Sequence, residues 1–249
     1  MPGSKRVYNV HITRIHAKDK KLLPRKAKLV KLPSLVDLRS KMPPVYDQGE
    51  LGSCTANALC AAFQYIVPTF QGSRLFLYYN ERKLENDIPD DAGAYLQDGI
   101  QCLQTFGLCP ESEWPYDISQ FAVKPPQQCY IDALNDKAVE VHNINNDMNS
   151  MKHCLHSGFP FVVAIAIYPE FESIDVAITG VVSMPSNEES LGGHAVLVCG
   201  YNDLTQQWIV RNSWGASWGD KGYFYLPYKY LLDSSLATDL WCITKTNVT

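Results

Sequence analysis

Apolar residues in the first half of the chain follow patterns that predict helices. The stretch from Cys54 to about Val67 is so apolar that a buried helix is expected there rather than a surface helix. Ser53 precedes the stretch as a candidate N-cap, and Pro68 ends it. Its plainly polar residues are Thr55, Asn57 and Gln64. The same kind of pattern predicts two further helices, over residues 74–86 and 94–107.

After about Asp136 the pattern changes to short runs of β-branched and aromatic residues separated by turn residues. The predicted strands cover residues 159–168, 194–202, 207–214 and 222–227. Helices followed by strands predict an α+β fold with two lobes. We divide the chain into a basic N-terminal segment at 1–32, a mainly helical lobe at 33–138 and a mainly β lobe at 139–249.

Charge sets the N-terminal segment apart from the rest of the chain. Residues 1–31 carry ten Lys and Arg and one acidic residue, a net charge of +9, whereas the remainder carries −13. Such a segment can fold back electrostatically on the acidic body, or be a solvated tail or a nucleic-acid arm. The alternation of Tyr8, Val10 and Ile12 predicts a short extended piece within it.

Composition also limits where the protein acts. No apolar run reaches the roughly 18 residues that a membrane span needs, and the N-terminus lacks the apolar core of a secretory signal. We therefore expect a cytoplasmic location or a non-classical delivery route rather than a lysosomal one, with the compartment itself left open. The cysteines are widely spaced and several lie inside apolar runs, which favours free thiols in a reducing compartment. They are Cys54, Cys60, Cys102, Cys109, Cys129, Cys154, Cys199 and Cys242.

Cys54 stands between a Gly-rich turn and the apolar helix, in DQGELGSCTANALCAAF. Its position is compatible with a nucleophile, half of a disulfide or a small buried side chain. A helix N-terminus carries partial positive charge and unpaired N–H groups, which stabilise a thiolate. Gln48, six residues earlier, is placed to donate toward an oxyanion beside the Cys54 N–H. A purely structural role fits Cys60 better, because Cys60 lies well inside the apolar run.

A cysteine nucleophile needs a histidine base and a group that orients the histidine. His194 opens the predicted strand 194–202. A hairpin centred near Asp203 would place His194 opposite Asn212, with Cβ atoms roughly 4.5–5.5 Å apart. The Asn212 carbonyl oxygen would accept from one ring N–H and fix the tautomer, and Trp214 would shield this bond from water. The alternative is a packed hairpin with incidental polar residues.

The other five histidines are weaker candidates. His11 and His16 lie in the basic segment, and His142 lies near the start of the β lobe. His153 and His156 form HCLH, which looks like a metal-binding motif but has no second ligand cluster. We therefore expect structural or surface roles for that pair.

Three sequence blocks resemble the signature blocks of the papain-like cysteine proteases: QGELGSC, GGHAVLVCGY and RNSWGASWGDKGYFYLP. In that family the His and Asn lie roughly 130–150 residues after the Cys, and here the separations are 140 and 158 residues. The resemblance runs from about Pro33 to Trp241 and is strongest to bacterial and viral members without a long helical propeptide. It implies a papain-like two-lobe fold, with a helical lobe, an antiparallel β-barrel-like lobe and an active-site cleft between them.

The resemblance also implies roles for individual residues. Cys54 would be the nucleophile, His194 the general base and acid, Asn212 its orienting residue, Gln48 an oxyanion donor and Trp214 a shield. Residues 1–32 would act as a short propeptide that partly covers the cleft, although a flexible or purely structural arm stays an alternative.

The chain departs from the family pattern at three positions near these residues. Leu51 stands where relatives have a disulfide-forming Cys, so that disulfide is absent. Thr55 replaces the usual Trp after the nucleophile, and Gly193 replaces the frequent Asp before the histidine. None of these changes removes a catalytic atom, so we expect them to affect specificity and pH optimum rather than activity itself.

The resemblance to the papain-like proteases further implies a set of substrate-binding residues. They are Gly93, Ala94, Tyr95, Leu96, Gly193, Ala195 and Trp214. This apolar and partly aromatic lining favours a hydrophobic residue at P2, two positions before the scissile bond. We therefore expect a monomeric cysteine endopeptidase that acts on peptides through an acyl-enzyme, without metal, organic cofactor or nucleic acid. A catalytically silent binding module and a Cys-His acyl transferase are the alternatives.

Overall fold

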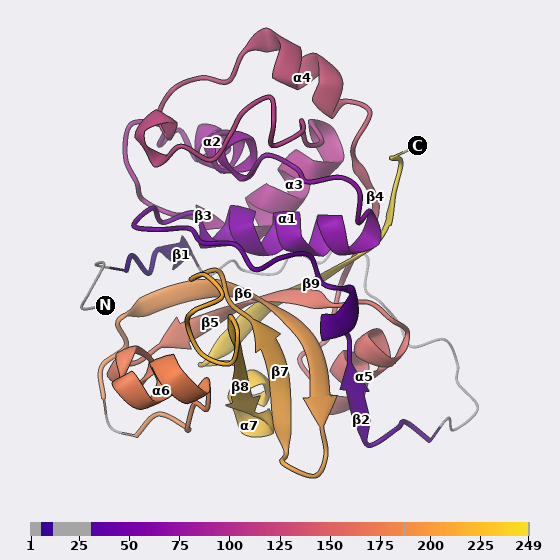
Figure 1. The fold of residues 1–249 in the computed structure, drawn as a ribbon, viewed down its shortest axis with the longest axis vertical. Coiled ribbons are helices and arrows are strands. Elements are labelled where there is room, and N and C mark those ends of the chain that lie inside the picture. The colour runs from indigo at the N-terminus through magenta and orange to yellow at the C-terminus, as the bar shows by residue number, and fades with distance from the viewer. Residues whose placement is uncertain (1–5, 12–30, 187, 249) are drawn as a thin grey trace.

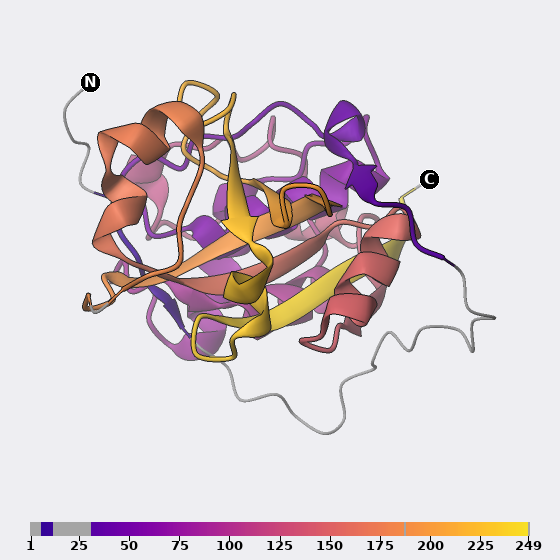
Figure 2. The ribbon, with the colours of Figure 1, turned by 90° about the horizontal axis from the view of Figure 1, so that it is seen from below.

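The computed structural model describes residues 6–11, 31–186 and 188–248, so most of the predicted basic segment, with His16, lies outside the described residues. Figure 1 shows a helical half above a strand-rich half, and the view from below in Figure 2 looks onto the strand-rich half. The predicted α+β class with two lobes is confirmed. Within the described ranges, no helix combines the length and apolarity that crossing a membrane requires.

The helical half is organised around one buried helix. Its helices are α1 (Cys54–Ile66), α2 (Arg74–Glu85), α3 (Leu96–Thr105) and α4 (Gln127–Ala133). The first three match the predicted helices to within two residues at each end. Every residue of α1 except Ile66 is buried, as its apolar sequence predicts. In Figure 1, α1 lies between the other helices and the sheet.

The start of α1 differs from the expectation in one detail. Ser53 precedes the helix, but its side chain makes no capping hydrogen bond. Instead the Ser53 hydroxyl lies 2.5 Å from the Tyr116 hydroxyl and accepts a hydrogen bond from Asn57 Nδ2 at 3.0 Å. The expected side-chain N-cap is therefore wrong, because Tyr116 and Asn57 bind the hydroxyl that would have capped the helix.

The strand-rich half is an open antiparallel sheet with the order β4-β9-β5-β6-β7-β8, and β2 also pairs with β6. Its strands are β2 (Leu35–Asp37), β4 (Ala138–Asn143), β5 (Phe161–Ile167), β6 (Gly192–Asn202), β7 (Gln207–Arg211), β8 (Tyr223–Pro227) and β9 (Ala237–Thr246). In the described part of the chain this sheet does not close into a barrel. Strand β5 lies in the middle of the order and is buried on both faces, which explains its unbroken apolar run.

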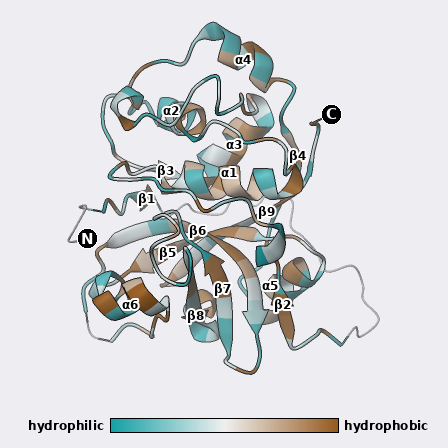
Figure 3. Ribbon diagram, viewed as in Figure 1, coloured by the Kyte–Doolittle hydropathy of each residue, from teal (hydrophilic) through white to brown (hydrophobic). Residues whose placement is uncertain are grey.

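Short helices that the sequence pattern did not predict flank the sheet. They are α5 (Met148–His156), α6 (Ile174–Thr179) and α7 (Tyr228–Leu232), together with 3₁₀ turns at Arg39–Lys41 and Pro169–Glu172. A further 3₁₀ turn, Ile118–Gln120, lies in the helical half between α3 and α4. In Figures 1 and 2, α5 and α6 lie at opposite sides of the sheet. Much of α6 is coloured brown in Figure 3, and two of its residues, Ile174 and Ile178, are exposed.

Strands β6 and β7 form the predicted hairpin, but in a different register. The turn between them spans four residues, so the hairpin is not centred on Asp203. Leu197 pairs with Arg211, where β7 ends. Asn212 therefore follows the strand, and the expected direct opposition of His194 and Asn212 in the ladder is wrong.

One hydrophobic cluster joins the two halves. It contains Leu59 and Phe63 of α1, Leu197 of β6 and Trp241 of β9, all buried. A second cluster fills the other side of the sheet, around the fully buried Trp208 of β7. Because α1 belongs to the first cluster, its position on the sheet is fixed by side chains from both halves.

Leu59→Ala tests how much this cluster contributes to stability. The fully buried Leu59 side chain would leave a cavity, so the free energy of unfolding should fall by about 2–5 kcal/mol. Leu204→Ala is the matched control, because Leu204 is 91 % exposed and its loss should change stability by less than about 0.5 kcal/mol. Urea unfolding of both variants measures the difference, and equal midpoints would contradict the packing described here.

Candidate active site

Cys54 is the first residue of α1, the helix that lies at the seam between the two halves (Figure 1). Its side chain is fully buried. Burial raises the pKa of the Cys54 thiol to about 12, while hydrogen bonds from the backbone N–H groups of Ala195, Thr55 and Cys54 act in the opposite direction. Ala195 follows His194 in β6, so packing of α1 on β6 brings the thiol to the residue next to the predicted base.

His194 and Asn212 form the predicted hydrogen bond despite the changed register. His194 Nε2 lies 2.8 Å from Asn212 Oδ1, and the Ser213 N–H also donates to that oxygen at 2.8 Å. An amide oxygen only accepts, so Nε2 carries the proton and donates it. The other ring nitrogen, Nδ1, is buried and has no hydrogen-bond partner among the described residues. The neutral ring therefore offers an unprotonated nitrogen.

Burial also controls the charge of His194. The loss of water around the ring lowers the pKa of His194 to about 4, the Asn212 hydrogen bond raises it, and the positive charge of Arg6 lowers it further. Together with the raised pKa of Cys54, this keeps both groups neutral near pH 7 in this structure.

Trp214 covers the His194–Asn212 pair, as expected. Its ring stacks on the imidazole with centroids 5.0 Å apart and an interplanar angle of 29°. Phe171 and Trp218 pack against the indole in turn. This aromatic group excludes water from the hydrogen bond and fixes the ring plane of His194.

Gln48 is held beside the same pair through Ser213, a residue that the sequence analysis missed. Ser213 Oγ donates to Gln48 Oε1 at 2.6 Å, and Gln48 Nε2 donates to the Leu51 carbonyl at 3.0 Å. The Gln48 backbone N–H also donates to the Ser213 carbonyl at 2.9 Å. One N–H of the Gln48 amide is left for another acceptor. The adjacency of Ser213 to Asn212 is the signal that could have identified it.

Two more residues that the sequence analysis did not single out support the nucleophile end of α1. The Tyr116 hydroxyl donates to the Gln48 carbonyl at 3.0 Å. Glu81 of α2 is fully buried and accepts a hydrogen bond from Thr55 Oγ1 at 2.7 Å, while burial raises the pKa of its carboxyl to about 8. No local pattern marks either residue, since both act through contacts between distant segments.

Residues 6–11, which we call the covering segment, lie across this site between the two halves (Figure 1). Within it, β1 (Val10–His11) pairs in parallel with β3 (Ala94–Tyr95), and Asn9 bridges to Gly193. The glycines permit this close approach. A Cβ on Gly93, whose φ is +85°, would lie 1.8 Å from the Asn9 carbonyl oxygen.

Side chains of the covering segment contact the histidine and its shield. The Tyr8 ring lies 6.3 Å from the His194 ring and 6.0 Å from Trp214, measured between centroids. The Arg6 guanidinium lies 5.1 Å from the Trp214 ring centroid and 3.6 Å from the Asp47 carboxylate. The segment is thus attached by polar and aromatic contacts around His194, which contributes to the burial of this histidine.

Other contacts secure the two ends of the covering segment. The Tyr8 hydroxyl donates to Glu172 Oε1 at 2.5 Å, and Asn9 Nδ2 donates to the Asp91 carbonyl at 2.9 Å. His11 Nδ1 lies 3.2 Å from Glu85 Oε2. His11 therefore binds the body of the protein, while His142, His153 and His156 lie apart from the site. His142 contacts Thr244, and His153 and His156 lie on α5.

A cavity of about 200 Å³ lies beside Gly193 and under the covering segment. Its lining is mostly apolar and consists of Val10, Ala164, Ile165, Ala166, Ser190, Gly192, Gly193, Ser235, Leu236, Ala237 and Thr238. Of the residues expected to bind substrate, Gly193 lines this cavity. The structure places Ala94 and Tyr95 against β1 instead, Leu96 in the core, Ala195 beside Cys54 and Trp214 on His194.

The fold is that of the papain-like proteases, as comparisons with known proteins show. The sequence profile of the papain family cysteine proteases matches residues 32–239. An uncharacterized peptidase C1-like protein of Acanthamoeba polyphaga mimivirus is 45% identical over 212 residues, which cover 79% of this chain and 68% of that protein. A probable cysteine protease of Arabidopsis thaliana is 29% identical over 208 residues, which cover 78% of this chain but 43% of that longer protein.

Among solved structures, xylellain, a cysteine protease from Xylella fastidiosa, superposes with a TM-score of 0.89 and 38% sequence identity. That superposition covers 98% of this chain and 99% of xylellain. The chain belongs to the papain family of cysteine proteases.

Arg6→Gln tests the electrostatic link between the covering segment and His194. Removing the positive charge should raise the pKa of His194, which NMR titration of the imidazole measures. The pKa of His194 is lower in this structure than in the unfolded chain, so folding favours the neutral ring. The stability that this difference contributes to the folded state is fully present above about pH 6.5 and is lost as the pH falls toward 4. Arg39→Gln is the control, because Arg39 pairs with Asp37 and Asp220 instead. An unchanged pKa of His194 in Arg6→Gln would contradict the link.

Proposed function

We propose that the protein is a cysteine endopeptidase in which Cys54 attacks the peptide carbonyl and His194 carries the proton. The observation that supports this most strongly is the 2.8 Å hydrogen bond between His194 and Asn212, which leaves Nδ1 unprotonated, while the backbone N–H of the next residue, Ala195, bonds to the Cys54 thiol. A structural histidine would have no need of an unpartnered buried nitrogen, because such a nitrogen costs free energy. A proton-accepting histidine requires one.

In the proposed reaction, Cys54 Sγ gives its proton to His194 Nδ1, and the thiolate attacks the carbonyl carbon of the substrate. The C–N bond then breaks as His194 protonates the leaving amine, which leaves a thioester on Cys54. Water gives a proton to His194 and attacks the thioester, and the C–S bond breaks to release the acid and restore the Cys54 thiol.

The oxyanion of this reaction has two candidate donors, the backbone N–H of Cys54 and the free N–H of Gln48 Nε2. The fixed contacts of Gln48 with Ser213 and Leu51 support the assignment, because they orient the amide before the substrate arrives. Each such donor typically contributes about 2.7–4 kcal/mol to transition-state stabilisation. The Cys54 N–H belongs to the first turn of α1, so the helix dipole adds to its effect.

The apolar cavity beside Gly193 supports a preference for a hydrophobic P2 residue. Val10 of the covering segment contributes to its lining, next to Ala164 of β5 and Leu236. Burial of an aliphatic side chain of this size contributes roughly 1.5–3 kcal/mol. We therefore propose that Val10 occupies the position that the P2 side chain of a substrate takes.

We also propose that the covering segment inhibits the enzyme. It occludes the site and removes water from Cys54 and His194, which disfavours the thiolate–imidazolium pair. The contact between Arg6 and Asp47 supports the earlier expectation that the basic segment folds back on the acidic body. Release of residues 6–11 would admit both water and substrate.

Cys54→Ala should abolish cleavage of a peptide library, with a loss of about 10⁴-fold or more in kcat, because no thiolate remains to form the thioester. The matched control is Cys60→Ala, which removes a buried thiol from the same helix. That variant should retain peptidase activity. Cleavage that persists in Cys54→Ala would refute the proposed role of Cys54, and product analysis with an added amine would reveal acyl transfer in place of hydrolysis.

Deletion of residues 1–32 should raise the initial rate of peptide hydrolysis, because the site would be open from the start. Val10→Asp should raise the rate as well, since it places a carboxylate in the apolar cavity and keeps the chain length. Val10→Ile keeps an aliphatic contact and should stay slow. Thermal unfolding checks that each variant is folded, and equal or lower activity in both opened variants would argue against inhibition.

A further inference from the structure

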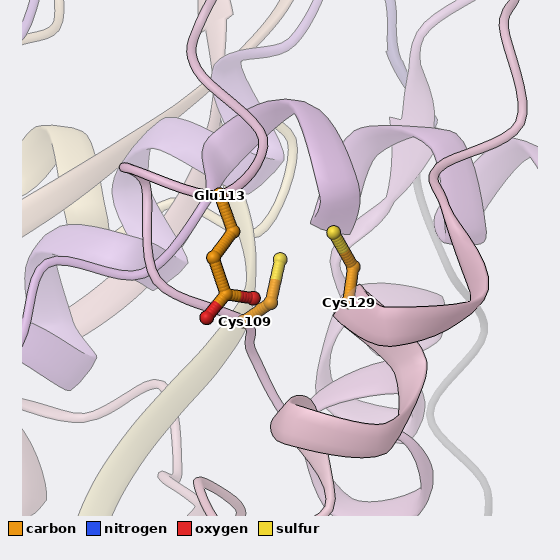
Figure 4. Close-up of side chains that lie close together, drawn as sticks. All are labelled: Cys109, Glu113 and Cys129. Atoms are coloured by element: carbon orange, nitrogen blue, oxygen red, sulfur yellow. The ribbon is translucent and has the colours of Figure 1, made fainter.

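A second cluster of reactive side chains lies in the helical half, apart from Cys54 and His194. It consists of Cys109, Glu113 and Cys129, whose ligand atoms all lie within 4.8 Å of one another (Figure 4). Cys109 lies in the loop after α3, Glu113 lies four residues later, and Cys129 lies on α4. In Figure 1, α4 is at the end of the helical half that is farthest from the sheet.

The burial of this cluster is uneven in a way that suits a metal ion. Cys109 and Cys129 are 0 % and 2 % exposed and pack with Phe76 and Ala133. Glu113 is exposed, and a carboxylate oxygen of Glu113 lies within 4.8 Å of both sulfur atoms (Figure 4). An ion could therefore enter from solvent past the carboxylate and be held by two thiolates in a dry setting.

The charges around the cluster are uncompensated. Burial, followed by the charge of Asp132 and a hydrogen bond with it, raises the pKa of Glu113. Burial likewise raises the pKa of both thiols, and Cys109 shares a hydrogen bond with Cys129. Among the described residues, no Lys, Arg or His forms an ion pair with Glu113 or Asp132. A cation at this point would reverse each of these shifts.

We propose that Cys109, Cys129 and Glu113 bind a Zn²⁺ ion, with Asp132 or a water molecule as the fourth ligand. Zinc takes tetrahedral sets of thiolate and carboxylate ligands at about 2.3 Å from sulfur and about 2.0–2.2 Å from oxygen. Two sulfur atoms bound to one tetrahedral ion lie about 3.8 Å apart, which is within the 4.8 Å spread of these ligand atoms. Ca²⁺ and Mg²⁺ bind oxygen ligands and do not fit a pair of thiols.

Binding would release the two thiol protons, so affinity should fall as the pH falls. The ion would tie α4 to the loop that follows α3. Its expected role is structural, because the cluster touches neither Cys54 nor His194. The proposal therefore stands or falls independently of the peptidase activity. It departs from the sequence-based expectation of no metal site.

The experiment uses the full chain with Cys54→Ala, so that the active-site thiol cannot bind metal. Under reducing conditions, titration with Zn²⁺ against a chromophoric chelator should give one ion per chain. Co²⁺ in place of Zn²⁺ should give thiolate-to-metal charge-transfer absorption. Zn²⁺ should also raise the unfolding temperature, because it binds the folded chain preferentially. No stoichiometric binding would overturn the proposal.

Variants locate the ion. In the same background, Cys129→Ser should weaken the Co²⁺ charge-transfer band, and Glu113→Gln should lower Zn²⁺ affinity by at least about 10-fold, the smallest loss typical of changes around a zinc site. Glu113 is exposed, so its variant should fold. Cys154→Ser is the matched control, because Cys154 and Cys242 are a buried thiol pair with no third donor in reach among the described residues.

Two results would reject the zinc site. The first is Zn²⁺ affinity that is the same in Cys129→Ser and Glu113→Gln as in their parent. The second is a Cys109–Cys129 disulfide, found by peptide mapping of protein purified without added oxidant, because the thiols would then be unavailable to the ion. Retention of binding in Cys154→Ser together with its loss in Cys129→Ser supports the proposal.

Discussion

The packing of the N-terminal end of α1 against β6 is the contact on which the active site depends. It places the Cys54 sulfur beside the Ala195 N–H, one residue from His194. Because α1 is buried on nearly its whole surface, it cannot shift without disturbing the core that joins the two halves. The site is therefore positioned by the least deformable part of the molecule, and short polar links such as Ser213 then connect Gln48 to Asn212.

Desolvation connects the covering segment to the chemistry of the site. The same burial raises the pKa of Cys54 and lowers that of His194, so the pair is held neutral while residues 6–11 are in place. In the proposed inhibition, the segment would have two effects, since it would block substrate and also disfavour the charged form of Cys54. Both effects end together when water reaches the site.

Particular residues show how far the sequence predicts this structure. The apolar run from Cys54 specifies α1 almost to the residue, and the His194–Asn212 pair is found although the assumed hairpin register is wrong. A short turn limits how far apart the two side chains can be, so the contact survives an error in register. The side-chain cap expected at Ser53 fails because Tyr116, from a distant loop, binds the same hydroxyl.

The sequence by itself determined the α+β order of elements and pointed to Cys54, His194 and Asn212 as the candidate site residues, because these follow from local periodicity and from short motifs. Only the tertiary structure decided which segments that are distant in the sequence come into contact. The path of residues 6–11, the cavity lined by β5, β6 and the start of β9, and the meeting of Cys109 with Cys129 all join segments that have no local signal of their proximity. Such contacts depend on how the whole core packs, which no single stretch of sequence encodes.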